Sequence, residues 1–297
     1  RAPAVADRRL ARHRAHRRRQ VQLRHQGPGL SRFPQPDRAH VRTAGAGKSN
    51  FLVHLGASAL KRGYNVLHYT FELSENCIGI RYDACLTGVS QNDANELKEA
   101  ITKLIPTMPQ ATLYIKSYPT KSASIQTLKN HMHTLDVKNF KPDLIIVDYG
   151  DIMRSVKGYE AKRFELESIY EDLRGMAQEL DVAIWTAAQS SRGGVNAEII
   201  DMDLMGESFA KVQIADIVLT FSRTREDKAT KGGRVYIAKN RIGQDGQIFN
   251  VKLDTATVSI SLNEQDDDCD IISPEREEHR TKQSLQKKWE ELKRETN

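Results

Sequence analysis

Long apolar runs and cysteine are both scarce in this chain of 297 residues. No apolar run approaches the roughly 18–20 residues of a membrane-spanning helix, so we expect no membrane association. The three cysteines, Cys77, Cys85 and Cys269, match neither a metal-ligand spacing nor a disulfide framework, which favours a reducing, cytoplasmic setting. The arginine-rich start also lacks the apolar stretch of a secretory signal.

Lysine is absent from the first 43 residues, although these residues carry the positive charge of the chain. They hold 12 Arg and two acids, whereas the whole chain has a formal charge of +6, so the remainder is net negative. The overall charge is therefore no evidence that the remainder binds nucleic acid. Residues 1–43 have no helical or strand period, and their composition predicts disorder.

From Gly45 to about residue 262, short apolar runs alternate with amphipathic segments. This alternation predicts an α/β domain over 44–262, with a mostly parallel sheet flanked by helices. Its last three strands follow one another closely and predict an antiparallel C-terminal extension. The predicted strands are Val66–Phe71, Leu113–Ser117, Leu144–Asp148, Val182–Ala187, Ile217–Phe221, Arg234–Lys239 and Ile248–Leu253. The predicted helices cover 49–62, 75–86, 91–104, 123–135 and the apolar stripe from Leu166 to Leu180.

Residues 263–297 are predicted to be an acidic linker followed by a helical tail. Three aspartates open the segment, and Ser273–Pro274 is a typical helix start. Because Leu285, Trp289 and Leu292 form only a thin apolar face, this helix is either solvated or docked on a partner.

A glycine-rich segment at the start of the domain predicts a phosphate-binding loop. In such a loop, glycines let backbone N–H groups surround phosphates at a helix N-terminus. The lysine reaches the β- and γ-phosphates, and the serine hydroxyl ligates Mg²⁺. A flexible Gly-Lys-Ser linker is the alternative interpretation. The nucleotide-binding candidates are Gly45, Ala46, Gly47, Lys48, Ser49 and Asn50.

The segment ahead of this loop departs from the full pattern. Arg42 stands where the pattern has glycine, and Pro34 and Pro36 interrupt the place of a preceding buried strand. The sheet would then lack its central strand. We therefore interpret residues 1–44 as disordered or translated in a shifted reading frame. A shift of one base would restore Gly-Pro-Pro before Gly45, and the nucleotide sequence tests this hypothesis.

Polar residues at the ends of three predicted strands complete a candidate hydrolytic site. Asp148 ends an apolar strand, where a carboxylate lies beside the phosphate loop and can hold Mg²⁺ together with Ser49. Glu72 follows the strand after the loop's helix and is positioned to orient an attacking water as general base. Gln189 ends a further strand, where its amide can sense the γ-phosphate. An ordinary exposed glutamate and a capping glutamine are the alternatives.

Two cations, Lys239 and Arg241, end a late strand and lie two residues apart, so both point the same way. That placement suits the phosphates of a partner. An exposed basic turn is the simpler interpretation.

Taken in order, these segments resemble the DnaB-type hexameric replicative helicases and, among them, the T-even phage members. The resemblance covers residues 45–262. It rests on Gly45–Asn50, Tyr69-Thr-Phe-Glu72, Ile115-Lys-Ser-Tyr-Pro119, Leu144-Ile-Ile-Val-Asp148-Tyr, Trp185-Thr-Ala-Ala-Gln189 and Ala238-Lys-Asn-Arg241. It implies a RecA-like P-loop ATPase that uses ATP or another NTP with Mg²⁺ and moves 5′ to 3′ on single-stranded DNA. Arg241 would be an arginine finger acting on the neighbouring subunit, assisted by Lys239, and Gln189 would couple the nucleotide to DNA.

The resemblance also implies partners and a DNA-binding surface. A homo-hexamer is expected, with primase, a helicase loader or a polymerase as further partners in a bacterial or phage-infected cell. DNA would contact loops 154–163 and 190–211 through phosphate, and solvated surface loops are the alternative. The candidate DNA contacts are Arg154, Lys157, Lys162, Arg163, Arg192 and Lys211. Residues 1–43 do not resemble the family's helical N-terminal domain, so we expect a fragment or a damaged start.

Three other functions fit the same sequence. A RecA/RadA-type recombinase or a circadian-clock-like ATPase would share the fold, and a recombinase would exchange strands on filaments. A non-hydrolysing nucleic-acid-binding protein would bind through its basic N-terminus, and Lys48→Ala would leave its DNA binding intact. An inactive translation product is the third.

Overall fold

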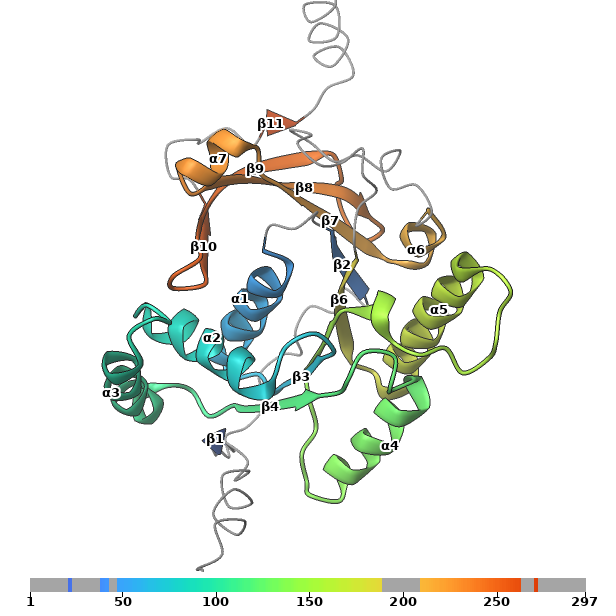
Figure 1. The fold of residues 1–297 in the computed structure, drawn as a ribbon, viewed down its shortest axis with the longest axis horizontal. Helices are drawn as coiled ribbons and strands as arrows, with labels where there is room; N and C mark the ends of the chain where they lie inside the picture. The colour runs from blue at the N-terminus through green and yellow to red at the C-terminus, as the bar shows by residue number, and fades with distance from the viewer. Residues whose placement is uncertain (1–20, 23–37, 43–46, 189–208, 263–269, 272–297) are drawn as a thin grey trace, which may run out of the picture.

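The structure, a computed structural model, describes residues 21–22, 38–42, 47–188, 209–262 and 270–271. They form one mixed β-sheet with helices on both faces (Figure 1). The neighbouring strands run in the order β1-β4-β3-β5-β6-β2-β7-β8-β9-β10, and β11 pairs with β9. Strands β4, β3, β5, β6, β2 and β7 are parallel, and β8, β9 and β10 extend the sheet in antiparallel pairs.

The elements alternate between strand and helix over most of the chain. The strands are β1 Val21–Gln22, β2 Arg38–Arg42, β3 Val66–Thr70, β4 Thr112–Ser117, β5 Leu144–Asp148, β6 Ala183–Ala188, β7 Ile217–Ser222, β8 Gly232–Asn240, β9 Gln247–Asp254, β10 Ser259–Leu262 and β11 Asp270–Ile271. The α-helices are α1 Lys48–Lys61, α2 Glu75–Thr87, α3 Ala94–Leu104, α4 Ile125–Asp136, α5 Lys162–Leu180, α6 Phe209–Ile214 and α7 Arg225–Ala229. Two 3₁₀ turns are η1 Ile105–Thr107 and η2 Gly150–Ile152.

The predicted α/β fold with a parallel sheet and an antiparallel extension is confirmed. Each predicted strand and helix of residues 44–262 has a counterpart whose ends differ by at most a few residues. The predicted helical tail lies outside the described residues. Among the described helices, none combines the length and the apolar composition needed to cross a membrane.

Strand β2 corrects the expectation that residues 1–43 contribute no strand. It lies between β6 and β7 and pairs in parallel with both, so the sheet has a central strand ahead of the loop. An extended segment fits there because β6 and β7 each offer a row of backbone N–H and C=O groups that must be paired. Val21–Gln22 also pairs, with β4. The reading-frame hypothesis stays a prediction about the nucleotide sequence.

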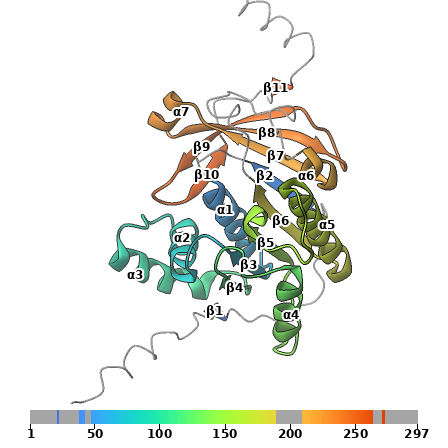
Figure 2. The ribbon, with the colours of Figure 1, turned by 45° about the vertical axis from the view of Figure 1, so that its right-hand side comes forward.

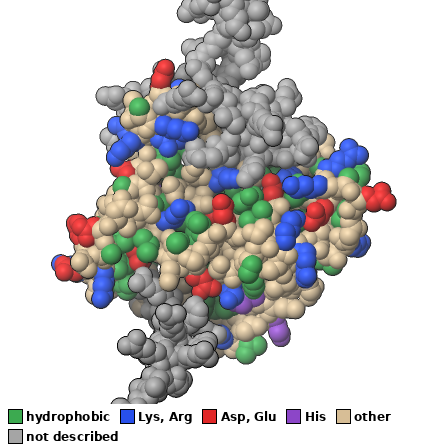
Figure 3. Space-filling model, viewed as in Figure 1, with side chains coloured by type: hydrophobic (Ala, Val, Ile, Leu, Met, Phe, Trp, Pro, Cys, Tyr) green, Lys and Arg blue, Asp and Glu red, His purple; other side chains and the backbone are tan. Residues whose placement is uncertain are grey.

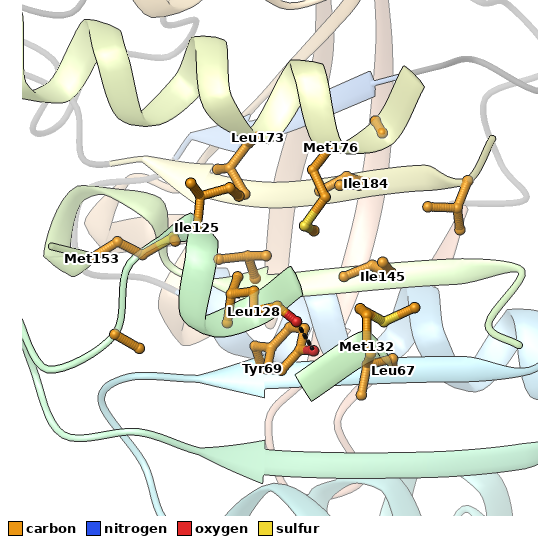
Figure 4. Close-up of a cluster of buried hydrophobic side chains, with 14 of the residues drawn as sticks. Leu67, Tyr69, Ile125, Leu128, Met132, Ile145, Met153, Leu173, Met176 and Ile184 are labelled. Carbon is orange, nitrogen blue, oxygen red and sulfur yellow. Dashed lines mark hydrogen bonds between the residues drawn. The ribbon is translucent and has the colours of Figure 1, made fainter. Parts of the chain in front are cut away.

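The buried strands direct alternate side chains to the two faces of the sheet. Val66 packs with α1 and α2 on one face, whereas Leu67 and Tyr69 pack with α4 and α5 on the other. Figure 4 shows this second cluster, in which Leu128 and Met176 meet the strand residues. The cores on both faces fix the helices, and hence the strand ends that carry the candidate site.

A close contact between α1 and α2 gives a stability prediction. A Cβ on Gly56 would lie 2.1 Å from the Tyr82 hydroxyl and 2.9 Å from the Ile146 Cδ1. The Tyr82 hydroxyl also hydrogen-bonds the Nδ1 of the buried His68 at 3.0 Å. We expect Gly56→Ala to lower the free energy of unfolding by about 1–3 kcal/mol because the core must move.

Gly175→Ala is the matched control, because a Cβ on this α5 glycine would meet nothing within 4 Å. We expect it to raise the free energy of unfolding by roughly 0.5–1 kcal/mol through helix propensity. Urea unfolding measures both variants, and equal stabilities would contradict the described packing.

Candidate nucleotide site

The N-terminus of α1 provides an anion-binding edge. Gly47 precedes the helix with φ 110° and ψ 19°, which side-chain-bearing residues rarely adopt, and a Cβ there would lie 3.1 Å from the Leu253 Cδ2. Among the residues that the structure describes, no side chain caps the helix, and its first turn holds no acid. The first backbone N–H groups and the helix dipole therefore favour a negatively charged group. Gly45 and Ala46 lie outside the described residues.

Asp148 ends β5 inside the protein. Its side chain is fully buried, and neither carboxylate oxygen makes a hydrogen bond within the described residues. Burial raises the pKa of Asp148, while the nearby Ser49 hydroxyl and Lys48 partly oppose the shift. An ionised carboxylate without a partner in such a place is costly unless a cation or a donor compensates it.

Lys48 lies at the meeting point of the candidate carboxylates. Burial lowers its pKa, and the charges of Asp148, Asp151 and Glu72 act against that shift in this order. Its ammonium group stands 4.3 Å from the centre of the Tyr149 ring. The first turn of α1 and the carboxyl ends of β3 and β5 thus bring a cation and three acids together.

Glu72 is held beside this group by the backbone. The Phe71 N–H donates to the Asp148 carbonyl at 2.8 Å, so the chain after β3 follows the end of β5. Burial raises the pKa of both Asp148 and Tyr149, and the charge of the exposed Glu72 side chain adds to both shifts. An exposed carboxylate next to an anion-binding helix end can contact water and a bound phosphate at once.

The donor set suits Mg²⁺ better than a transition metal. Mg²⁺ prefers carboxylate, hydroxyl and water oxygens and commonly binds through one or two protein groups plus phosphates. The orphaned Asp148 oxygens beside the Ser49 hydroxyl provide such a set. Within the described residues, no group of three or more His, Cys, Asp or Glu could hold a metal.

The buried Asp148 gives a second stability prediction. Because its folded-state pKa is raised, the ionised carboxylate destabilises the nucleotide-free protein, and stability returns as the pH falls through that pKa. At pH 7–8 in EDTA, we therefore expect Asp148→Asn to raise the melting temperature. Each kcal/mol gained in the free energy of unfolding raises the melting temperature of a domain of this size by about 2–4 °C.

Asp254→Asn is the opposite-sign control for this prediction. Hydrogen bonds from Lys231 and the Ala256 N–H lower the pKa of Asp254, so its neutralisation is expected to lower the melting temperature. A fall for both variants would contradict the account of Asp148.

Lys239 and Arg241 lie at the far side of the sheet, against the end of α6. The Lys239 Nζ donates to the Val212 and Gln213 carbonyls at 2.8 and 3.0 Å. The Arg241 guanidinium donates to Asp216 and to the Gln213 carbonyl, both at 2.9 Å. The predicted common direction of the two side chains is thus observed within this chain. Their action on a neighbouring subunit stays a prediction.

Lys211 is a correction. It was predicted as an exposed DNA contact, but it lies on α6 with only 3% of its surface exposed. Its Nζ pairs with the Asp151 carboxylate at 2.5 Å and lies 5.0 Å from the centre of the Tyr170 ring. A short helix, not a loop, carries the residue, so its charge is used inside the protein.

The other basic DNA candidates that the structure describes are on the surface. Arg154, Lys157, Lys162 and Arg163 are exposed, on the loop after η2 and in the first turn of α5. Figure 3 shows Lys and Arg side chains interspersed with acids on the right-hand side of the view, where Figure 1 places α5. Gln189 and Arg192 lie outside the described residues.

Sequence reasoning did not single out several residues that the structure brings into these groups. Asp151 and Tyr149 directly follow the strand ending in Asp148, and their place after that strand was the available signal. Arg174 and Asp216 contact the end of α6, and no sequence motif marks them.

Comparisons with known proteins agree with this geometry. The model of the DnaB-like helicase C-terminal domain matches residues 41–258. The DnaB-like replicative helicase of Enterobacteria phage T4 is 31% identical over 66% of this chain and 44% of its own length. A replicative DNA helicase DnaB of Helicobacter pylori is 22% identical over 73% of this chain and 49% of its own length. The chain therefore spans less than half of these relatives.

Solved structures give the fold. One of them, an ATPase domain, superposes with a TM-score of 0.65 at 18% identity, covering 77% of this chain and 85% of that one. A structure of a DnaB-like replicative helicase and its interactions with primase superposes with a TM-score of 0.64 at 18% identity. The match covers 75% of this chain and 56% of that chain. The predicted RecA-like helicase fold is confirmed, and the match over residues 41–258 shows that the chain belongs to the DnaB-like helicase family.

Proposed function

We propose that this chain is the motor domain of a ring-forming replicative helicase that hydrolyses ATP or another NTP and moves 5′ to 3′ on single-stranded DNA. The observation that carries the proposal is the convergence of Lys48, Glu72 and the orphaned Asp148 beside the uncapped start of α1. Membership of the DnaB-like family supports it. Such a role would place the chain with replicating DNA in the cytoplasm of a bacterium or a phage-infected host.

The residues around α1 would bind the nucleotide. Backbone N–H groups of Gly45–Asn50 would surround the phosphates, and the Lys48 ammonium would contact the β- and γ-oxygens. Ser49 and Asp148 would hold Mg²⁺ directly or through water. A bound Mg²⁺ would neutralise charge on the β- and γ-phosphate oxygens.

Glu72 would activate the water. Its exposed carboxylate follows the end of β3, and its charge acts on both Lys48 and Asp148, so it would face a γ-phosphate bound beside Lys48. The carboxylate would orient a water for in-line attack on the γ-phosphorus and accept its proton, while the bond to the β-phosphate oxygen breaks. Gln189 would sense the loss of the γ-phosphate.

A second subunit would complete the site. Arg241, with Lys239, would reach the γ-phosphate of the neighbouring subunit in a homo-hexamer, where an arginine stabilises the charge of the transition state. Primase, a helicase loader or a polymerase are proposed further partners. The structural relative solved with primase supports the first of these only by analogy.

The exposed basic residues around α5 would grip DNA through phosphate. Lys162 and Arg163 occupy the first turn of α5, where the helix dipole disfavours cations. An anionic partner such as a DNA phosphate would offset this unfavourable placement. Arg154, Lys157 and Arg192 would add to the same sequence-independent contact. Tyr159 and Phe164 are 39% and 45% exposed beside them, and the Arg163 guanidinium lies 4.6 Å from the centre of the Phe164 ring.

Unwinding polarity tests the proposal. We expect ATP-dependent separation of a forked duplex bearing a 5′ single-stranded tail and none of a duplex with only a 3′ tail. Glu72→Gln is the control, because it should bind nucleotide and DNA without unwinding. Unwinding from the 3′ tail would overturn the polarity, and strand exchange without unwinding would favour a recombinase.

A further inference from the structure

Three cations from two parts of the chain converge on the C-terminal end of α6. Arg174, on α5, donates to the Ile214 carbonyl at 2.6 Å. Lys239, on β8, donates to the Val212 and Gln213 carbonyls, and Arg241 donates to Gln213 as well. Figures 1 and 2 both show α6 beside α5, and β8 pairs with β7, which directly follows α6. The carbonyls that a helix leaves unpaired at its end thus receive all three side chains.

Asp216 is the carboxylate at this junction. One of its oxygens, Oδ1, accepts from Arg241 at 2.9 Å and lies 3.4 Å from the Arg174 guanidinium. The Arg241 backbone N–H also donates to the Asp216 carbonyl at 2.9 Å. Arg241 is therefore tied to Asp216 through both its main chain and its side chain.

The exposures of the two partners differ in a way that suits positioning. The Asp216 side chain is 10% exposed, whereas the Arg241 side chain is 44% exposed and the next residue, Ile242, is 64% exposed. A nearly buried acid thus holds an arginine whose side chain is still partly exposed to solvent. Because Asp216 is shared with Arg174, its single charge cannot fully neutralise both guanidinium groups, which leaves attraction for an anion.

The same short helix also contacts the candidate nucleotide site. Lys211 pairs with Asp151, whose charge in turn acts to raise the pKa of Lys48. Within α6, Phe209–Ile214, Lys211 therefore faces Asp151 of the candidate nucleotide site, while the next carbonyls along the chain receive Lys239 and Arg241. A shift of α6 would move the carbonyls on which Lys239 and Arg241 rest.

We propose that Asp216 is the positioning residue of Arg241, holding its guanidinium, together with Lys239, at the end of α6 in the direction needed to meet a neighbouring subunit's nucleotide. The proposal rests on the proposed function, because Arg241 must act on that nucleotide. Asp216 itself contacts no nucleotide. It restricts the conformations of the long, flexible Arg241 side chain. Its removal should therefore lower the rate of turnover and leave nucleotide binding unchanged.

The test compares the kcat and KM of ATP hydrolysis for Asp216→Asn, Asp216→Glu and Arg241→Ala. A guanidinium displaced by about 1 Å can cost on the order of 10²-fold in rate, so we expect a fall of this size for Asp216→Asn with KM and nucleotide affinity nearly unchanged. Asp216→Glu keeps the charge on which the fold could depend, and its longer side chain should produce a smaller fall. The matched control is Asp227→Asn. It removes the carboxylate that pairs at 2.9 Å with Arg234, on β8, and we expect no change in kcat.

Mixing variants separates positioning from general damage. Asp216→Asn subunits keep their own nucleotide site, so Lys48→Ala subunits, which keep a well-positioned Arg241, should restore activity to them. Arg241→Ala subunits should not. Activity of Asp216→Asn and Asp216→Glu equal to that of the unaltered chain, with Arg241→Ala inactive, would overturn the proposal alone. Full activity of Arg241→Ala would instead overturn the arginine-finger role in the proposed function.

Discussion

Arg241→Ala is expected to lower the kcat of ATP hydrolysis by about 10³–10⁵-fold, the range that an arginine finger contributes in related phosphoryl transfers. The side chain follows β8, which β6, β2 and β7 separate from β5 and its Asp148, and it is bound to Asp216 and Gln213. We therefore expect it to take no part in binding nucleotide to the same subunit. Affinity for a fluorescent ATP analogue should stay unchanged while turnover is lost.

Arg234→Ala controls for the loss of a charged side chain from β8. Its guanidinium pairs with Asp227 at the other end of the strand, so its removal should cost some stability and no catalytic rate. An Arg241→Ala protein that hydrolyses ATP within severalfold of the unaltered chain would refute the trans-acting role. A parallel loss of nucleotide affinity would indicate damage to the fold.

Lys48→Ala is expected to abolish both binding and hydrolysis. Its ammonium group is the cation that faces Asp148, Asp151 and Glu72 at the start of α1, so its loss leaves phosphates facing carboxylates. Removing one preorganised donor to a developing charge costs about 10²–10³-fold in kcat, and the loss of ground-state phosphate binding adds to it. Equilibrium titration with a fluorescent ATP analogue measures the binding component directly.

Lys61→Ala is the matched control at the other end of the same helix. Lys61 donates to the Cys85 carbonyl at 3.2 Å and lies in the last turn of α1, so its removal should leave nucleotide affinity unchanged. Retained ATP binding and DNA-stimulated hydrolysis in Lys48→Ala would remove the phosphate-loop interpretation. If Lys48→Ala still binds DNA but no longer hydrolyses ATP, the residues that bind DNA are separate from those that bind the nucleotide.

The core of the fold was predictable because its strands are buried on both faces. Leu144–Asp148 was predicted at its observed bounds, since a continuous apolar run between two helical layers leaves little choice. Strand β2 was missed because Arg38, His40 and Arg42 interrupt any apolar run. Its place depends on the opening between β6 and β7, which no local pattern reveals.

The grouping of residues at the candidate nucleotide site followed from one topological rule, whereas the contacts of Lys211 and Arg241 did not. Parallel strands bring their carboxyl ends to one edge, so the order of the sequence motifs was enough to place Glu72 and Asp148 beside Lys48. Lys211 was predicted to contact DNA because it ends the segment 190–211, which the sequence predicts as a loop, yet α6 carries it and its Nζ pairs with Asp151. Pairings between distant segments, such as Arg241 with Asp216, arise only from tertiary packing.

The proposed role of this chain is that of a DNA-dependent motor whose nucleotide site is completed by a second subunit. The most direct measurement is the ATPase rate per subunit at increasing protein concentration, with and without single-stranded DNA. A rate that rises steeply with concentration and rises further with DNA is the predicted result. A slow rate that changes with neither protein concentration nor DNA would contradict this role and would leave a nucleotide-binding domain without motor activity.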